Sequence, residues 1–182
     1  MTWFKHMSAL VLAVSMMAGG QAAPVRPVSA QAELRLKYGS NEVKAGDMVL
    51  HIVRGFVGNL SASGFDTFTV YVLPEKAEEP WLLVTAPAPK GIGFNLRNYE
   101  TADANIQSIS FYKDGGQLYA VEAVRNNVSG PGANLKKAGV DFHVYKFNQD
   151  WDVPMFNEEA VMHAKSQYQD ASEALKKEFY LR

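Results

Sequence analysis

The amino-acid sequence predicts a mainly β protein, an antiparallel β-sheet or sandwich with one or two C-terminal α-helices packed on it. Short runs rich in Val, Ile, Tyr, Phe and Thr recur from Glu33 onward and alternate with clusters of Gly, Pro, Asn and Asp, a pattern typical of antiparallel strands. The tetrapeptide Lys113-Asp114-Gly115-Gly116 separates two such segments. Because Asp-Gly accommodates the positive φ angles of a tight hairpin, these two segments should be neighbouring strands.

The beginning of the chain has the features of a cleavable export signal. Lys5 precedes an uncharged apolar run from Met7 to Ala18, the arrangement of a secretory signal peptide. That run is shorter than the roughly 20 apolar residues that a membrane-spanning helix needs. We therefore expect export with no membrane insertion after signal cleavage, and a cysteine-free β domain behind such a signal fits the bacterial periplasm.

The cleavage position is open among three alanines. Ala22 lies nearer the apolar run, whereas Ala30 and Ala32 form the small-x-small pattern that a signal peptidase cuts. With the cut after Ala32, residues 1–32 are the signal peptide and residues 33–182 form a single β-rich domain, which is an ordinary size for one hydrophobic core.

Alternating apolar residues place the strands within this domain. We expect them at 33–38, 47–57, 65–73, 81–86, 105–112, 117–125 and 140–148. In 65–73 both alternating sets are apolar or aromatic, which predicts a strand covered on both faces. In 105–112, by contrast, Ile109 and Phe111 share one face and two serines lie on the other, which predicts a sheet with one dry face.

The C-terminal segment predicts the helices. Asn157 followed by two glutamates has the composition of a capped helix start, and the apolar stripe behind it consists of Val161, Ala164 and Tyr168. Asp170 with Glu173 three residues later resembles a capping box. Behind that second start, apolar residues recur at i, i+4 and i+8, namely Ala171, Leu175 and Phe179. Both stripes would pack on the sheet.

Charge and composition exclude several classes of partner. Removal of Lys5 and Arg26 with the leader leaves 16 basic against 19 acidic residues, a net charge of about −3, which argues against nucleic acid as a partner. The absence of cysteine excludes disulfide and thiol chemistry. The three histidines that remain after removal of the leader are His51, His143 and His163, and they are isolated in sequence. We therefore expect no zinc or other metal site.

Catalytic and cofactor motifs are also missing. The chain has no Gly-x-Ser-x-Gly, the nucleophile elbow of many hydrolases. Ser110 and Lys113 match Ser-x-x-Lys, but that motif works when the two residues meet one helical turn apart, and here they lie in a predicted strand. Gly130-Pro131-Gly132 lacks the strand, helix and lysine of a phosphate-binding loop. We predict no cofactor and no catalytic residue.

Three polar residues beside apolar strands remain as candidate ligand contacts: Asp66, Asp103 and Arg125. Each could equally be a strand-edge charge or part of an ion pair. In a binding cleft, the Arg125 guanidinium would hold a ligand carboxylate with two hydrogen bonds. The connections 87–104 and 126–139 are long and contain Gly and Pro, and long loops in compact domains are either functional or mobile.

Several of these segments together resemble the carbapenem intrinsic resistance proteins of the CarG family. The similarity runs from about Leu34 to Glu178 and consists of scattered strand residues: Ser63 to Val72, Trp81 to Val84, Ala102-Asp103 before Ile106, Asp114-Gly115, Glu122 to Arg125, Phe142 to Tyr145 and Tyr168 to Asp170. The resemblance implies a periplasmic β-rich protein that protects the cell from carbapenems without being a β-lactamase. It supplies no catalytic residues for these positions.

The sequence therefore predicts a non-enzymatic periplasmic protein that binds a β-lactam or a cell-wall protein. One alternative is a hydrolase with an unrecognised site such as Ser61 with His143, which could converge in space without a motif. Another is a structural module that binds a partner protein along a sheet edge.

Overall fold

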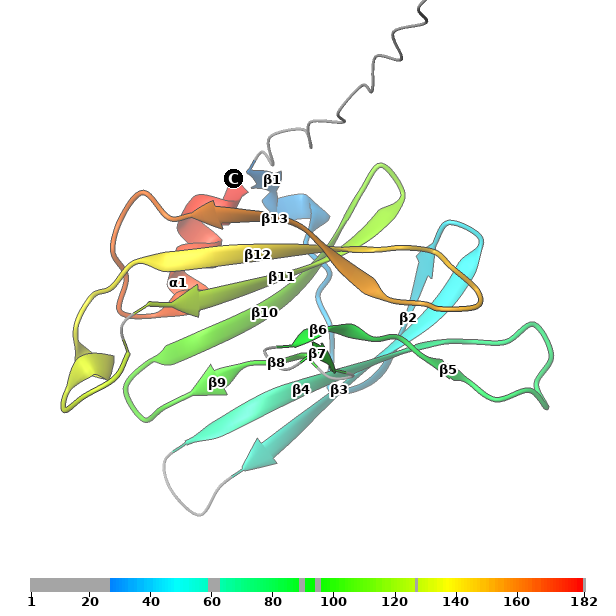
Figure 1. Ribbon diagram of the computed structural model, residues 1–182, viewed down its shortest axis with the longest axis horizontal. Coiled ribbons are helices and arrows are strands. Elements are labelled where there is room, and N and C mark those ends of the chain that lie inside the picture. Colours follow the sequence, from blue (N-terminus) through cyan, green and yellow to red (C-terminus); the bar gives the residue numbers. More distant parts are fainter. Residues whose placement is uncertain (1–26, 59–62, 89–90, 94–95, 127, 182) are drawn as a thin grey trace, which may run out of the picture.

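The computed structural model describes residues 27–58, 63–88, 91–93, 96–126 and 128–181 (Figure 1). It confirms the predicted fold class, because the strands of the large sheet pair antiparallel and one helix follows them at the C-terminal end. Within the described ranges, no helix is both long and apolar enough to cross a membrane.

One large sheet contains most of the strands. Its main path runs in the order β13 (Phe156–His163), β12 (Val140–Phe147), β11 (Gln117–Arg125), β10 (Asn105–Asp114), β9 (Tyr99–Glu100), β4 (Gly64–Val72), β3 (Met48–Gly58) and β2 (Gly39–Ala45). Two short strands, β5 (Leu82–Leu83) and β8 (Leu96–Arg97), also pair with β4. Two further pairs stand apart: β6 (Ala86–Ala88) with β7 (Gly91–Gly93), and β1 (Val28–Ser29) with β14 (Tyr180–Leu181).

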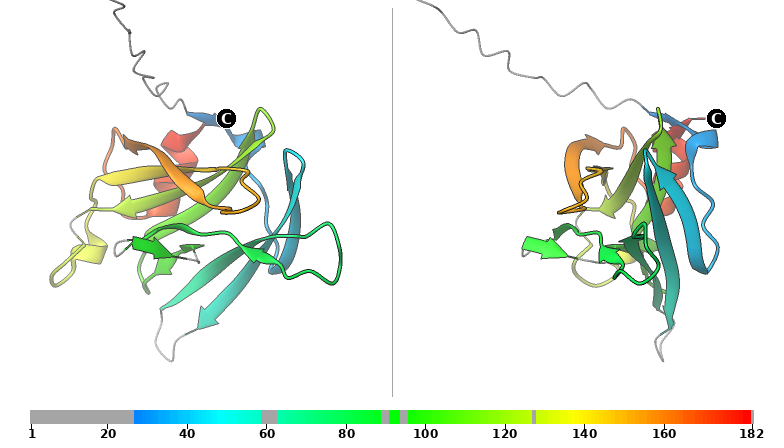
Figure 2. Two further views of the ribbon diagram at one scale, coloured as in Figure 1. Left: turned by 45° about the vertical axis from the view of Figure 1, so that its right-hand side comes forward. Right: turned by 90° about the vertical axis from the view of Figure 1, so that its right-hand side faces the viewer.

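The large sheet is divided into two halves at β9. Among the described strands, only this two-residue strand pairs with both β10 and β4, and Figure 2 shows that the β2–β4 half and the β12–β13 half do not lie in one plane. A hydrophobic core fills the space between them, with buried side chains from both halves such as Leu50, Phe68, Phe111 and Phe147. The two halves therefore pack together around this first core.

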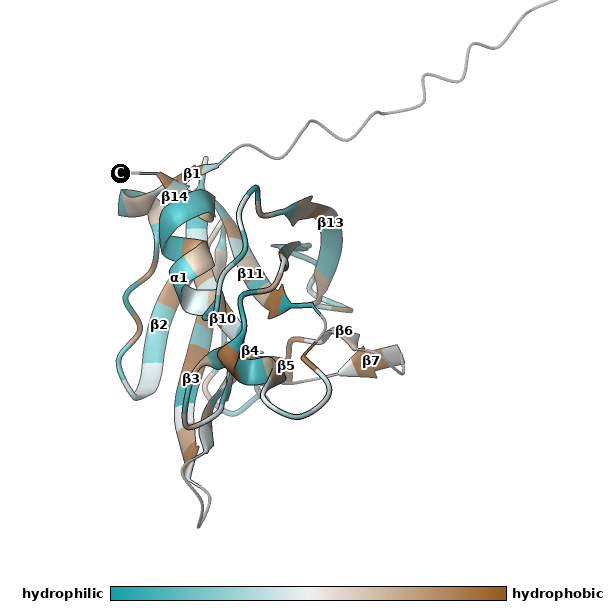
Figure 3. Ribbon diagram, turned by 90° about the vertical axis from the view of Figure 1, so that its left-hand side faces the viewer, coloured by the Kyte–Doolittle hydropathy of each residue, from teal (hydrophilic) through white to brown (hydrophobic). Residues whose placement is uncertain are grey.

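The C-terminal helix packs on the half of the sheet that contains β10 and β11, on the face opposite the first core. α1 (Ala171–Ala174) continues as the π-helical turn η3 (Leu175–Phe179), and Figure 3 shows α1 along β10 and β11. A second core lies beneath it and includes the fully buried Phe142, Ala171 and Phe179. The apolar stripe predicted for this helix is confirmed, and so is the predicted cap, because the Asp170 carboxylate accepts from the backbone N–H groups of Ser172 and Glu173.

The predicted hairpin is also confirmed. β10 and β11 pair in continuous register from Gln107 with Val124 to Asp114 with Gln117. The two residues between them, Gly115 and Gly116, have φ angles of 56° and 83°. A two-residue turn with both φ angles positive matches the twist of the strands that it joins.

Two predictions near the N-terminus of the domain are wrong in detail. Residues 33–38 do not form a strand. Leu34 and Leu36 instead lie as an extended strap against the first core. The strand follows at β2, between the predicted strands 33–38 and 47–57. In β4, Phe68, Val70 and Val72 are buried, whereas the alternate set is half exposed, so only one face of this strand is fully covered.

The helix predicted from Asn157 is wrong, because that segment is the edge strand β13. Its pairing with β12 shifts between Val144 and Tyr145, which pair with Ala160 and Glu158. The extra residue is a β-bulge, and a bulge reverses the alternation of the side chains that follow it. Phe156 therefore enters the first core and Met162 packs against the second.

Candidate functional site

Arg125 ends β11 at the start of the connection to β12, and its side chain organises that connection. Only 2% of the residue is exposed. Its Nη1 donates to the carbonyl of Asn134 at 3.3 Å, and its Nη2 donates to the carbonyls of Ala133 and Lys136. These carbonyls belong to or adjoin the short 3-10 helix η2 (Ala133–Leu135), so the buried guanidinium fixes the conformation of the loop.

The electrostatic state of Arg125 follows from this position. Burial lowers the pKa of its guanidinium, while the nearby charge of Asp170 raises it. An arginine stays protonated in proteins even so. Its Nε has no hydrogen-bond partner among the residues that the structure describes. Arg125 thus places a positive charge beneath the loop, with both Nη atoms already occupied by carbonyl oxygens.

Asp103 contacts the same loop from the other side. It is exposed, and its Oδ2 accepts a hydrogen bond of 2.8 Å from the Asn134 Nδ2. Asn134 is therefore held twice, by Arg125 through its carbonyl and by Asp103 through its side chain. The structure brings these two predicted site residues to one loop, although they are not bonded to each other.

A hollow of about 490 Å³ lies over this loop, and we call it the loop hollow. Its lining consists of Ser129, Gly130, Pro131, Ala133, Lys136, Lys137, Ala138, Gly139 and Gln167. The two segments that flank it are joined by reciprocal backbone hydrogen bonds between Ala138 and Tyr168, of 2.9 and 2.8 Å. Both sides of the hollow are thereby fixed to the folded domain.

The polar groups of the loop hollow favour an anionic ligand. Lys136 and Lys137 are exposed, Gln167 adds an amide, and the described residues of the lining include no carboxylate. Ammonium and amide N–H groups are donors for a carboxylate, and hydrogen bonds to a charged group are stronger than those between neutral groups. The volume lies within the range of roughly 300 to 1,000 Å³ that is usual for small-molecule sites.

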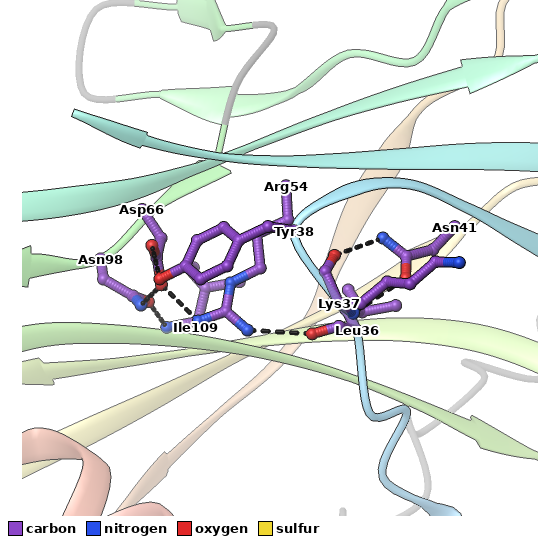
Figure 4. A network of polar contacts seen from close by, with 8 residues as sticks. All are labelled: Leu36, Lys37, Tyr38, Asn41, Arg54, Asp66, Asn98 and Ile109. Atoms are coloured by element: carbon purple, nitrogen blue, oxygen red, sulfur yellow. Dashed lines mark hydrogen bonds and ion pairs between the residues drawn. The ribbon is translucent and has the colours of Figure 1, made fainter.

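Asp66, the third predicted residue, lies elsewhere, at the seam between the halves of the sheet (Figure 4). Its Oδ2 binds the Arg54 Nη2 at 2.7 Å, and its Oδ1 accepts from the Tyr38 hydroxyl at 3.1 Å. Asn98 adds a longer hydrogen bond to Oδ2, of 3.3 Å. The carboxylate is buried and well supplied with donors, so its contacts in this structure are structural.

The Asp66 cluster joins segments that are distant in sequence. Arg54 also donates from Nη1 to the carbonyl of Leu36 at 2.9 Å, and its guanidinium lies 4.4 Å from the centre of the Tyr38 ring. On the far side, the Asn98 Oδ1 accepts from the Ile109 backbone N–H at 2.6 Å. The N-terminal strap, β3, β4 and β10 are thus held together at one point (Figure 4).

Trp151 lines another hollow, of about 470 Å³, with Val72, Pro74, Pro80 and Leu82 among its apolar residues. Trp81 nearby packs edge-on against the His51 and Tyr71 rings and is 49% exposed. The charged residues of this hollow are Glu75, Glu79 and Lys76, which give it a net negative charge. It is therefore a less favourable place for an anionic ligand than the loop hollow.

His143 and Ser110, two of the positions considered for catalysis, have other partners. Ser61, part of the hydrolase alternative, lies outside the described residues, and the His143 Nδ1 is 2.9 Å from a Glu158 carboxylate oxygen. Ser110 lies in β10, where its Oγ donates to Glu33 and accepts from the Tyr180 hydroxyl. Among the residues that the structure places, no three His, Cys, Asp or Glu side chains gather into a possible metal site.

Sequence reasoning singled out the residues beneath the loop and missed those that line it. Lys136, Lys137 and Gln167 were not chosen, although two adjacent lysines behind Gly-Pro-Gly are a recognisable signal for a basic loop. Gln167 carries no such signal in the sequence. It reaches the loop only through the backbone pairing of Ala138 with Tyr168, which are distant in sequence. Ligand binding by Asp66, Asp103 and Arg125 stays a prediction.

Comparison with known proteins supports the fold. No protein-family model matches the chain, and no curated protein matches it. A solved structure with a similar fold is the crystal structure of CarG, with a TM-score of 0.64 and 18% sequence identity over 82% of this chain and 99% of that one. The resemblance found in the sequence is thus confirmed at the level of the fold.

Proposed function

We propose that this chain is an exported, non-enzymatic binding protein that captures a carboxylate-bearing small molecule of the β-lactam class in the loop hollow. The observation that carries the proposal is the loop hollow itself, whose described lining has two lysines and an amide but no carboxylate. The CarG-like fold supports the proposal, and the predicted export signal would bring the protein to the compartment where β-lactams act.

The supporting geometry is a loop that is ordered before any ligand arrives. Arg125 and Asp103 both fix Asn134, so Lys136 and Lys137 project from a backbone that is already shaped. A preorganised site loses less conformational entropy on binding. In this proposal Arg125 acts as a positioning residue that also contributes positive potential, instead of gripping the ligand carboxylate.

Titration calorimetry of the purified protein with a carbapenem tests the site. Replacing both lysines, Lys136→Gln with Lys137→Gln, should weaken binding at least tenfold, because each tenfold corresponds to about 1.4 kcal/mol and a charge-assisted hydrogen bond contributes about that much or more. The matched control is Lys44→Gln, which removes an exposed lysine from β2 and should leave affinity unchanged. Equal affinity of the wild type and the double variant would refute this site.

The absorbance of the β-lactam ring separates binding from catalysis in the same mixture. Reversible capture leaves the absorbance intact, whereas covalent trapping removes one equivalent and then stops. Continued loss would identify an enzyme and reject the non-enzymatic proposal. A host test completes the set: a susceptible strain that exports the wild type should tolerate more carbapenem than one that exports the double lysine variant.

A further inference from the structure

The residues just before Glu33 belong to the folded domain. Val28 and Ser29 form β1, which pairs in parallel with Tyr180 and Leu181 of β14. Figure 1 shows β1 beside the C-terminal end of the chain. The Ser29 hydroxyl then caps the following 3-10 turn η1 (Ala30–Ala32) by accepting from the Gln31 backbone N–H. These residues have regular structure, although a signal peptide that ended at Ala32 would include them.

Packing explains why small residues stand at positions 30 and 32. Ala30 and Ala32 are half-buried and pack, together with Val28, against the second core that contains Phe179 and Tyr180. The Ala-x-Ala pattern that suggests a peptidase site there is thus accounted for by a requirement of the fold. It carries no separate evidence for cleavage at that point.

The segment continues without interruption into the strap. The Leu34 backbone N–H donates to the Phe111 carbonyl at 2.8 Å, and the Glu33 carboxylate accepts from the Ser110 hydroxyl at 2.9 Å. Ser110 in turn accepts from the Tyr180 hydroxyl at 2.9 Å. Hydrogen bonds therefore connect the strap, β10 and β14, and they begin at the residue that follows η1 in the sequence.

We infer that the export signal is removed upstream of β1, after Ala22, and that the mature protein keeps residues 23–32. The inference rests on the proposed export. Of the three candidate positions, a cut after Ala32 would remove β1 and η1, and a cut after Ala30 would remove β1 and divide η1. Ala22, with Gly20 two residues before it, supplies the small-x-small pattern and leaves every residue of β1 in place.

The test is the intact mass of the protein recovered from the periplasm after expression of the full chain. A mass that corresponds to residues 23–182 supports the inference. A mass that starts at Gln31 or Glu33 overturns it while leaving export established. An uncleaved chain of residues 1–182 that stays in the cytoplasm overturns export and the processing site together, so the two failures are distinguishable.

Two variants make the assignment specific. Ala22→Arg places a bulky charge where the peptidase needs a small residue, so uncleaved precursor should accumulate. Ala32→Val replaces the small residue at the other candidate position by a larger one and should give the same starting residue as the wild type. Normal processing of Ala22→Arg with loss of processing in Ala32→Val is the reverse pattern and would reject the inference.

Discussion

The side chain of Arg125 shows how a buried charge can shape a loop without touching a ligand. Its two Nη atoms donate hydrogen bonds to three backbone carbonyls of one short segment, those of Ala133, Asn134 and Lys136. Hydrogen bonds to a charged donor are worth about 1.5 to 3 kcal/mol each when the partners stay buried. The loop therefore depends on one residue far more than its Gly/Pro-rich composition suggests.

Replacement of this residue should loosen the loop and weaken the fold. We expect Arg125→Met to lower the free energy of unfolding by about 2 kcal/mol or more, because the carbonyls lose their donors. Urea denaturation measures the free energy of unfolding, and hydrogen exchange over residues 128–139 measures the loosening of the loop. Arg125→Lys, which keeps the charge but not the forked donors, should restore only part of the loss. Unchanged exchange in Arg125→Met would contradict the assigned role.

At this scale the sequence indicated some positions and not their partners. Asp66 and Arg125 stood out because a charge within an apolar strand needs a partner. Their partners, Arg54 on β3 and the carbonyls of η2, follow from strand register and loop geometry, which one sequence does not display. An ion pair was one of the interpretations of these charges, and Asp66 forms one with Arg54.

The C-terminal helix was predictable because its signals are local. Asp170 caps it through Ser172 and Glu173, and the same carboxylate binds the Asn105 backbone N–H at 3.0 Å. β13 was not predictable in the same way, because its bulge at the pairing with Val144 and Tyr145 obscures the two-residue period. Its identity depends on the neighbouring strand and not on its own composition.

The Asp170 cap gives a prediction about pH. Burial alone would raise the pKa of Asp170, but the hydrogen bonds from Ser172, Asn105 and Glu173 outweigh it and lower the pKa. A carboxyl with a depressed folded pKa stabilises the fold above its unfolded value, about 3.9, and this contribution is lost as pH falls through the folded value. Asp170→Asn should therefore be less stable than the wild type at pH 7, by about 1 kcal/mol.

That difference should begin to shrink below about pH 4, where the carboxyl becomes protonated in the unfolded chain, and should be lost as pH falls through the lower pKa of the folded protein. Denaturant unfolding at a series of pH values measures it. Glu159→Gln, at an exposed position of β13, is the control and should differ from the wild type by no more than about 0.5 kcal/mol. A gap between Asp170→Asn and the wild type that stays constant down to pH 3 would show that the charge of Asp170 does not matter.

On the scale of the whole molecule, the N-terminal segment spans both cores. Val28 packs with the second core, and Leu34 and Leu36 pack with the first. The strap then reaches the Asp66 cluster through the Leu36 carbonyl (Figure 4). Since β9 is the only strand between β10 and β4 on the main path of the sheet, this segment is a second connection between its halves.

Removal of the first part of that segment should therefore destabilise the entire domain. A protein that begins at Glu33 lacks β1 and η1, and the half-buried Val28 alone represents about 1 to 2 kcal/mol of apolar burial. We expect its thermal midpoint to lie roughly 3 to 8 °C below that of a protein that begins at Ala23. A protein that begins at Pro27 keeps β1 and is the matched control, with an unchanged midpoint. Scanning calorimetry of the three proteins decides the matter: if the Glu33 form melts with the others, β1 contributes nothing to the fold, and the packing argument for upstream processing fails with it.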